Sequence, residues 1–415
     1  MHTHTARYLG LAASATAATL MLTACGGGSD DDSATAPAPA TRGTIAVSLA
    51  SNAPACGFDA VNLAISKLRF RQDVNPDPNA GGWTELSFSP AKRINLLHPA
   101  STVGGTNTAL GEIALPTGDY AQMSVVLEPA GGSLRPAGAA NDVPLEITAT
   151  AASNVRVPIN LKVEDGRKHE LLFEFNACDS VHPRGAAYVL LPRPRLPHQV
   201  ASGIGGFVDP AALPGNVVIT AQKGGTILAT TVPHPATGEF VLPRLAPDTY
   251  DVVMQGNGRA TAVIGAVPVA ASAVTQVGSA AAPIRLANST VSTISGQVTY
   301  AAPAVAPVDG TWIMASQTIS ADPAVGNAAT TVTNRLQPVD LATGNYTLPN
   351  LARASIQYAL YKPNQPLVPA NAASSGGNGR YRIEALAAGY INKTGSSANI
   401  NVSSGNASGV NISMP

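Results

Sequence analysis

The sequence predicts an all-β protein, with an N-terminal signal and a flexible stalk followed by three tandem antiparallel β-sandwich-type domains. Three observations predict this. The 415 residues include 39 Gly and 33 Pro and are rich in Val, Thr and Ala, a composition that favours strands and turns. From Gly43 onward apolar and polar residues alternate with a period of two, as in half-buried strands. Clusters of Pro, Asn, Asp and Gly separate these runs, as turns do.

The overall charge excludes one class of partner. The 25 Lys+Arg balance the 25 Asp+Glu, and only 12% of the residues are charged. Nucleic-acid binding depends on a basic surface, so we expect no nucleic-acid partner. A hydrophobic content of 45% is ordinary for folded domains.

The first element is a signal segment over residues 1–24. One Arg, at position 7, precedes an apolar run from Leu9 to Leu22. This run is too short and too rich in Ala, Ser and Thr to span a bilayer, and it fits the apolar part of a secretory signal.

The run ends in Leu22-Thr23-Ala24-Cys25, which resembles the lipobox of bacterial lipoproteins. The resemblance implies cleavage before Cys25, lipidation of Cys25 and anchoring in a membrane, and Gly26 implies the outer membrane. The alternative is an ordinary secretory signal with a Cys at the cleavage site by chance. Which face of that membrane the protein occupies stays open.

Residues 25–42 follow as a linker. The stretch carries Gly26-Gly27-Gly28, three consecutive Asp and an Ala/Pro/Thr run. It has too little apolar surface to fold, so we expect a flexible stalk.

The two remaining cysteines are Cys56 and Cys178. Export into an oxidising compartment favours a disulfide between them. Two separate buried thiols are the alternative.

The first β domain is expected over residues 43–197. Ile45, Val47 and Leu49 fall on one face, and similar alternation recurs up to the Pro-rich stretch of residues 191–197, which cannot continue a central strand. The segments Gly43–Leu49, Val61–Leu68 and Pro116–Met123 resemble the bacterial family called domain of unknown function 4382, found in exported lipoproteins. The resemblance implies no activity.

A diverged repeat follows. Gly206-Phe207-Val208 is echoed by Gly296-Gln297-Val298, and the stretch Thr237–Leu245 by Thr343–Leu351. In each copy Thr-Gly predicts a hairpin turn and the next aromatic a core position. The copies resemble the transthyretin-like (prealbumin-like) regulatory β-sandwich of carboxypeptidases, which implies domains over residues 201–287 and 290–415, the second with an insertion near residues 358–379.

Two stretches resemble the start of an enzyme or metal-binding motif, but neither is complete. His169-Glu170 begins like a zinc-protease helix but lacks the second His and alternates like a strand. Asp73-Val74-Asn75-Pro76-Asp77 begins like a calcium loop but has Pro78 where such loops need Gly, so an Asn/Pro turn is the better interpretation, and calcium binding stays open. The scattered histidines, including His182 and His234 beside prolines, are expected to be polar loop residues. We therefore predict no catalytic residue, no metal and no cofactor.

A sugar-binding platform would need exposed aromatic side chains. The candidates are Trp312, Tyr358, Tyr361 and Tyr381, three of which border the Gly/Asn/Pro-rich insertion. Trp83, after a Gly-Gly turn, is expected to pack in the core or at its rim.

Two functions follow as expectations. The first is a non-enzymatic, outer-membrane-anchored cell-envelope lipoprotein acting as a structural, adhesion or ligand-presenting module. The second is a carbohydrate-binding lipoprotein that uses the exposed aromatics. The expected partners are the membrane, through the lipid, and either a polysaccharide or an envelope protein.

Overall fold

The computed structural model describes residues 41–50, 56–75, 77, 80–97, 107–197, 202–302, 305–307, 309–324, 326–389, 393–394 and 399–414. Strands make up 58% of the structure and helices 5%, so the all-β prediction is confirmed. Residues 41–415 cluster as one compact unit. The predicted signal segment, Cys25 and most of the predicted linker lie outside the described residues.

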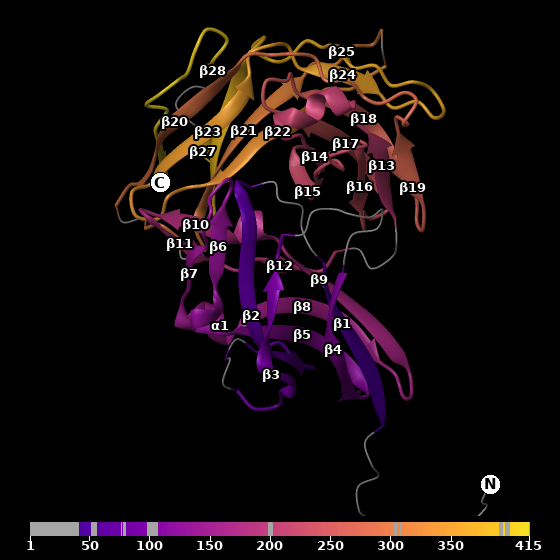
Figure 1. The fold of residues 1–415 in the computed structure, drawn as a ribbon, viewed down its shortest axis with the longest axis vertical. Helices are drawn as coiled ribbons and strands as arrows, with labels where there is room; N and C mark the ends of the chain where they lie inside the picture. The colour runs from indigo at the N-terminus through magenta and orange to yellow at the C-terminus, as the bar shows by residue number, and fades with distance from the viewer. Residues whose placement is uncertain are drawn as a thin grey trace, which may run out of the picture. The chain divides into compact units, whose positions relative to one another are not determined.

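The N-terminal body, residues 41–197, has two sheets (Figure 1). The first has the order β12 (Pro194–Arg195), β9 (Lys168–Phe175), β1 (Arg42–Ala50) and β4 (Asn107–Pro116). The second has the order β10 (Val181–Arg184), β11 (Ala187–Leu190), β7 (Val143–Ile147), β6 (Ser133–Pro136), β2 (Phe58–Arg71), β5 (Gly118–Leu127) and β8 (Val155–Val163), with β3 (Thr84–Asn95) also on β2.

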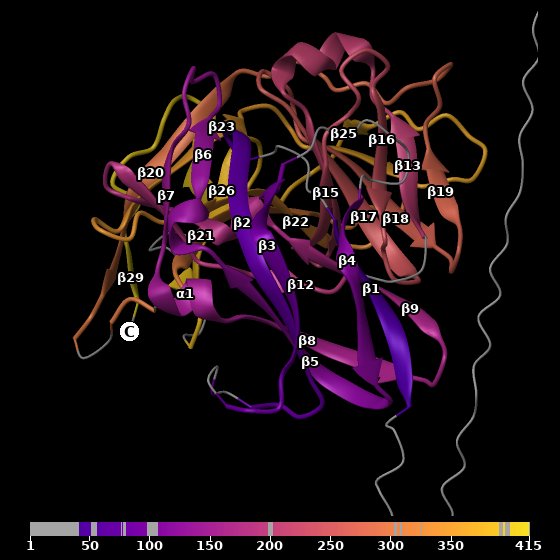
Figure 2. The ribbon, with the colours of Figure 1, turned by 60° about the horizontal axis from the view of Figure 1, so that its bottom comes forward.

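The expected alternation builds the core of this body. Ile45, Val47 and Leu49 of β1 are almost fully buried, while the residues between them are half-exposed. Figure 2 shows β4, β1 and β9 side by side; β1 pairs antiparallel with β4 but parallel with β9. Alternation alone cannot show strand direction, and parallel pairs occur in all three bodies.

The middle body, residues 202–286, also has two sheets. The smaller has the order β16 (Glu239–Pro243), β13 (Gly203–Phe207) and β19 (Val274–Val277). The larger begins with β15 (Thr226–Thr231), β14 (Val218–Lys223), β17 (Asp248–Gln255) and β18 (Ala262–Val269).

The C-terminal body, residues 290–414, repeats this plan. Its smaller sheet has the order β23 (Asn345–Ala352), β20 (Val291–Tyr300) and β29 (Ile412–Met414). Its larger sheet has the order β22 (Thr330–Pro338), β21 (Thr311–Ile319), β26 (Arg380–Ala387) and β27 (Lys393–Thr394), with β28 (Ile400–Asn401) also on β26.

The larger sheet of the middle body continues with two strands from the chain's last third. β24 (Gln357–Leu360) pairs parallel with β18, and β25 (Ala370–Asn371) pairs antiparallel with β24. A small core joins the two bodies at this seam; its members are Val253, Val263, Ile319, Val332, Ile356 and Tyr358. The middle and C-terminal bodies therefore share both a sheet and a core.

Helices are short and connect strands. They are η1 (Pro129–Gly131), α1 (Ala149–Ser153), α2 (Ala177–Ser180) and η2 (Pro210–Gly215). No helix in the described part of the chain is long and apolar enough to cross a membrane.

The sequence repeat is a structural repeat as well. Gly206 lies opposite Phe240 between β13 and β16, and Gly296 lies opposite Tyr346 between β20 and β23. A Cβ atom on Gly206 would stand 2.1 Å from the carbonyl oxygen of Val277, and one on Gly296 would stand 2.0 Å from that of Val410. Both glycines are therefore required by the close approach of a neighbouring stretch of backbone.

Candidate functional site

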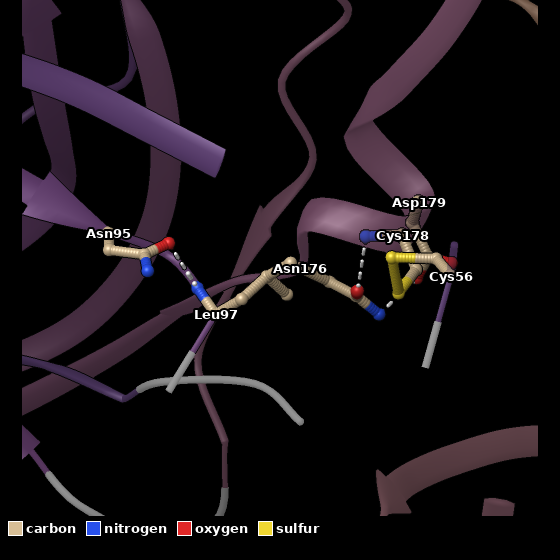
Figure 3. The surroundings of a disulfide bond; sticks show 6 residues. All are labelled: Cys56, Asn95, Leu97, Asn176, Cys178 and Asp179. Atoms are coloured by element: carbon tan, nitrogen blue, oxygen red, sulfur yellow. Dashed lines mark hydrogen bonds between the residues drawn. A yellow bond between two sulfur atoms is a disulfide. The ribbon is translucent and has the colours of Figure 1, made fainter. Parts of the chain in front are cut away.

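The disulfide end of the N-terminal body is held by a short capped helix. Asn176 precedes α2, and its side-chain oxygen accepts a hydrogen bond from the backbone N–H of Cys178 at 3.0 Å. Such a cap satisfies an N–H that the helix leaves without a partner. Cys178 is bonded to Cys56 just before β2, with Cα atoms 5.2 Å apart (Figure 3). The predicted disulfide is confirmed.

Charged groups next to this disulfide are partnered. Asn176 donates to the carboxylate of Asp179 at 2.7 Å (Figure 3). Burial raises the pKa of Asp179, against an opposing effect of the nearby Arg195. Arg195 itself makes two hydrogen bonds to Glu174, of 2.9 and 3.1 Å. These charged groups therefore stabilise the disulfide end of the N-terminal body through contacts with one another and with Asn176.

A cavity of about 840 Å³ lies beside the disulfide. We call it the junction cavity, because its walls come from all three bodies. Most of its polar lining carries hydroxyl or amide groups; examples are Thr220, Thr230, Gln255, Thr331, Gln337 and Asn345. Hydroxyl and amide side chains can each donate and accept hydrogen bonds, so this wall suits a ligand that does both.

One wall is aromatic. Phe58 and Tyr188 line the cavity with ring centroids 5.6 Å apart and planes at 85°, an edge-to-face pair. Both side chains are half-buried. They add an aromatic surface of fixed orientation to a lining that also contains the aliphatic side chains of Val218, Ile227 and Met314.

Arg335 on β22 differs from Arg195, the other cationic residue of the cavity lining, in having no acidic partner among the described residues. It stands in the same cross-strand row as Ala315 and Ile383, which belong to the core. Removal from water lowers its pKa, and its Nε donates to the carbonyl oxygen of Pro349 at 3.2 Å. In the part of the chain that the structure describes, no carboxylate pairs with its guanidinium.

The N-terminal body meets the C-terminal body beside the cavity. His182 of β10 is fully buried and lies edge to face against Trp312 of β21, with ring centroids 4.5 Å apart. The guanidinium carbon of Arg193 lies 3.6 Å from the centroid of the Trp312 ring, a cation–π contact. The expectation that His182 is a polar loop residue is wrong, because the C-terminal body covers it.

Asp340 fastens the same interface. Its Oδ1 accepts hydrogen bonds from the backbone N–H groups of Ala342 and Thr343, each at 2.9 Å. Its Oδ2 accepts from the backbone N–H of Gly185 in the N-terminal body, also at 2.9 Å. One carboxylate thus orders a hairpin turn and ties that turn to another body.

A side chain of the middle body makes hydrogen bonds to the backbone of the edge strand β22. Gln222 accepts a hydrogen bond from the backbone N–H of Thr333 at 2.7 Å and donates one to its carbonyl oxygen at 2.9 Å. Thr333 Oγ1 in turn donates to the carbonyl oxygen of Gly225 at 2.6 Å. The backbone of β22 is therefore paired with a side chain at this point.

The predicted aromatic platform is wrong for three of its four members. Trp312 is 4% exposed, Tyr358 9% and Tyr381 1%. Trp312 packs against the N-terminal body, Tyr358 lies in the core at the β18–β24 seam, and Tyr381 donates to the carbonyl oxygen of Ala352 at 2.7 Å. Tyr361 is half-buried against the core of the middle body. The four do not form one exposed face.

Two other sequence features have structural roles. The loop after β2 is a turn in which Asn75 accepts from the backbone N–H of Asp77 at 2.8 Å, while Asp73 pairs with Arg71. Trp83 is half-buried, with the guanidinium carbon of Arg71 5.6 Å from its ring centroid. His169 lies in strand β9, as its alternation predicts.

Among the described residues, no three or more His, Cys, Asp or Glu side chains come together in a way that could hold a metal ion. Cys25, the predicted lipidation site, lies outside the described residues.

The comparison with protein families finds one similarity, in the N-terminal body. Residues 42–192 match the family model described as "Domain of unknown function (DUF4382)". The match covers well under half of the chain, and we call residues 42–192 the matched segment. It contains the disulfide, His182 and Tyr188, whereas Arg335 and Trp312 lie outside it. No curated protein matches the sequence.

Among solved structures, two B repeat units of the collagen binding protein of Staphylococcus aureus align with a TM-score of 0.18 and 9% identity, over 90% of this chain and 98% of that one. The major pilin SpaA of Corynebacterium diphtheriae gives 0.15 and 13%, over 89% and 100%. The TIE protein of Bacillus anthracis gives 0.14 and 12%, over 90% and 51%.

The chain spans 27% of a leucine-rich repeat protein from Bacteroides thetaiotaomicron and 51% of the TIE protein. With TM-scores this low, the likenesses carry no functional argument.

Proposed function

We propose that this protein is a non-enzymatic, membrane-anchored lipoprotein of the cell envelope, a scaffold that carries and presents a ligand site. The observation that supports it best is the way the three bodies are fixed to one another. The ionisable groups beside the junction cavity hold the structure together: Arg195 pairs with Glu174, Asp340 ties Gly185, and His182 is covered by Trp312.

The anchor is proposed from the sequence. Leu22-Thr23-Ala24-Cys25 resembles a lipobox and Gly26 follows it, which favours lipidation of Cys25 and residence in the outer membrane. Several buried acyl chains would each add about 0.8 kcal/mol per methylene, enough for stable anchoring. The membrane face stays open between the periplasm and the cell surface.

Lipid labelling tests the anchor. Cells that express the full chain are fed a clickable fatty acid, and the wild type is compared with Cys25→Ala; the lipoprotein should carry the label and sediment with outer membranes, and the variant should do neither. Protease accessibility of the C-terminal body on intact and permeabilised cells then assigns the membrane face. An unlabelled wild type, recovered in the soluble fraction, would contradict the proposal.

Carbohydrate binding is the second candidate. The buried Trp312, Tyr358 and Tyr381 do not support it, but the hydroxyl, amide and aromatic groups that line the junction cavity do. A glycan panel tested against the purified protein distinguishes a passive scaffold from a glycan receptor.

A further inference from the structure

We propose that the junction cavity binds a short acidic oligosaccharide, with Arg335 pairing with a carboxylate or sulfate of the sugar. This inference deepens the proposed function, because it names the ligand class that the scaffold would present. The volume of the junction cavity, about 840 Å³, lies within the range of about 300–1,000 Å³ typical of ligand pockets.

The charge of the ligand follows from the partners of the cavity's charged residues. Four charged side chains line the cavity: Asp179, Arg195, Arg335 and Glu384. Arg195 pairs with Glu174, and Glu384 pairs with Arg382. Asp179 accepts a hydrogen bond from Asn176.

Arg335 differs from these three groups. Its Nε is used by the carbonyl oxygen of Pro349, while its two terminal nitrogens have no acceptor among the described residues. A partly buried guanidinium without an acidic neighbour is costly. Its planar pair of donors fits a carboxylate or sulfate in two parallel hydrogen bonds.

The sugar character follows from the rest of the wall. Thr230, Gln255, Gln337 and Thr347 offer groups that can both donate and accept, as the hydroxyls of a sugar do. The edge-to-face pair of Phe58 and Tyr188 offers the apolar surface on which the C–H face of a sugar ring can lie.

A peptide fits this cavity less well. Extended peptides bind by adding a strand to an open sheet edge. β22 is an edge strand that lines the cavity, but Gln222 already occupies the N–H and C=O of Thr333. A nucleic acid would need several cations, and Arg335 is the one lining cation without an acidic partner among the described residues.

The test uses the full-length protein purified in detergent and an array of uronate- and sulfate-bearing oligosaccharides beside their neutral counterparts. The wild type should bind at least one acidic oligosaccharide. It should bind the neutral counterpart of that oligosaccharide at least ten-fold more weakly. The R335Q variant should bind the acidic oligosaccharide at least ten-fold more weakly than the wild type, because it lacks the charged donor.

A second variant does not depend on a buried residue. Thr226 is exposed and lines the cavity from β15, so T226W should block entry and abolish binding without disturbing the core. The matched controls are R285Q, which removes an 83% exposed Arg elsewhere, and V274W, which adds a Trp at a 44% exposed position outside the cavity lining. Both controls should bind like the wild type.

Three results would overturn the inference: no acidic oligosaccharide binds, acidic and neutral oligosaccharides bind equally well, or binding survives both R335Q and T226W. If R335Q fails to fold, T226W alone decides whether the cavity is the site, and the neutral counterparts decide whether charge matters. Lipid labelling at Cys25 is read separately. A labelled protein that binds no glycan refutes this inference and leaves the anchored scaffold intact.

Discussion

The imidazole of His182 is enclosed by Trp312, which belongs to a different body and lies edge to face against it with ring planes at 79°. Gly310 leaves the space that the imidazole fills, since a Cβ at that position would stand 2.5 Å from the His182 ring. In the described structure neither ring nitrogen of His182 has a side-chain partner. From this packing we expect the interface to be sensitive to acid.

Stability should therefore fall as the pH falls from about 6.5 to about 4. Burial and the neighbouring Arg193 lower the pKa of His182 to about 4 from its ordinary 6.5, although a contact with the Val339 backbone opposes them. Between these values the unfolded chain binds a proton that the folded chain excludes, so unfolding becomes easier by up to roughly 3 kcal/mol. Above pH 6.5 this contribution is constant.

Denaturant unfolding at a series of pH values measures this effect. The variant His182→Phe keeps an aromatic ring but cannot titrate, so its stability should vary much less over this range. His234→Asn, in a hairpin turn of the middle body away from this interface, is the control and should follow the wild type. Asp179, Asp309 and Arg193 are the charged groups near this interface; if His182→Phe loses as much stability as the wild type, the acid response belongs to the carboxylates.

The repeated glycines should be intolerant of even one methyl group. Gly206→Ala and Gly296→Ala would each place a Cβ about 2 Å from a backbone oxygen, and we expect each to cost about 1–3 kcal/mol or to prevent folding. Gly405→Ala is the matched control, because nothing lies within 4 Å of its Cβ position. Thermal unfolding measures all three; equal melting temperatures would show that the strands can move apart freely.

The disulfide should contribute about 4–5 kcal/mol, because it links residues separated by 122 positions in the chain. Non-reducing peptide mapping should recover Cys56 joined to Cys178. Unfolding in urea, compared between the wild type and the Cys56→Ser/Cys178→Ser double variant, measures the contribution. An unchanged urea midpoint would mean that strand pairing alone holds the two ends together.

Two substitutions of Asp340 should separate its role in the hairpin turn from its role at the interface. Asp340→Asn keeps one acceptor oxygen for the turn amides but replaces the acceptor that faces Gly185. Asp340→Ala removes both. We expect the amide of Gly185 to exchange faster in both variants, with a loss of about 1–3 kcal/mol for each hydrogen bond to the charged group.

Hydrogen exchange followed by mass spectrometry resolves the two roles. Peptides that cover the hairpin at residues 340–345 should be protected in Asp340→Asn and deprotected in Asp340→Ala. Uniform protection in all three proteins would show that this carboxylate does not fasten the interface.

Local sequence patterns predicted much of this fold. Ile45, Val47 and Leu49 point into one core because side chains alternate along a strand. The hairpin turns at Gly238 and Gly344 adopt left-handed backbone angles, with φ of 73° and 71°, that favour glycine. Such features depend on neighbours within a few residues, which the sequence displays directly.

The junction depends on residues far apart in the chain, which explains the errors there. His182 precedes a proline and so resembles a surface residue, but its cover comes from Gly310 and Trp312. Tyr358 borders a Gly/Asn/Pro-rich stretch that is typical of loops, yet it belongs to a strand of a neighbouring sheet. Arg335 lies on a mostly polar strand without a clear period, so no local signal marks it as facing the core.

The parallel pairing of β24 with β18 has a consequence for evolution. The stretch of residues 358–379 interrupts the likeness between the two copies of the repeat, and that stretch includes most of β24 and all of β25. The segment that makes the second copy diverge therefore also binds it to the first. Exchanging, duplicating or deleting one copy alone would therefore break the sheet that the two copies share, and we expect the pair to behave as a single unit in recombination.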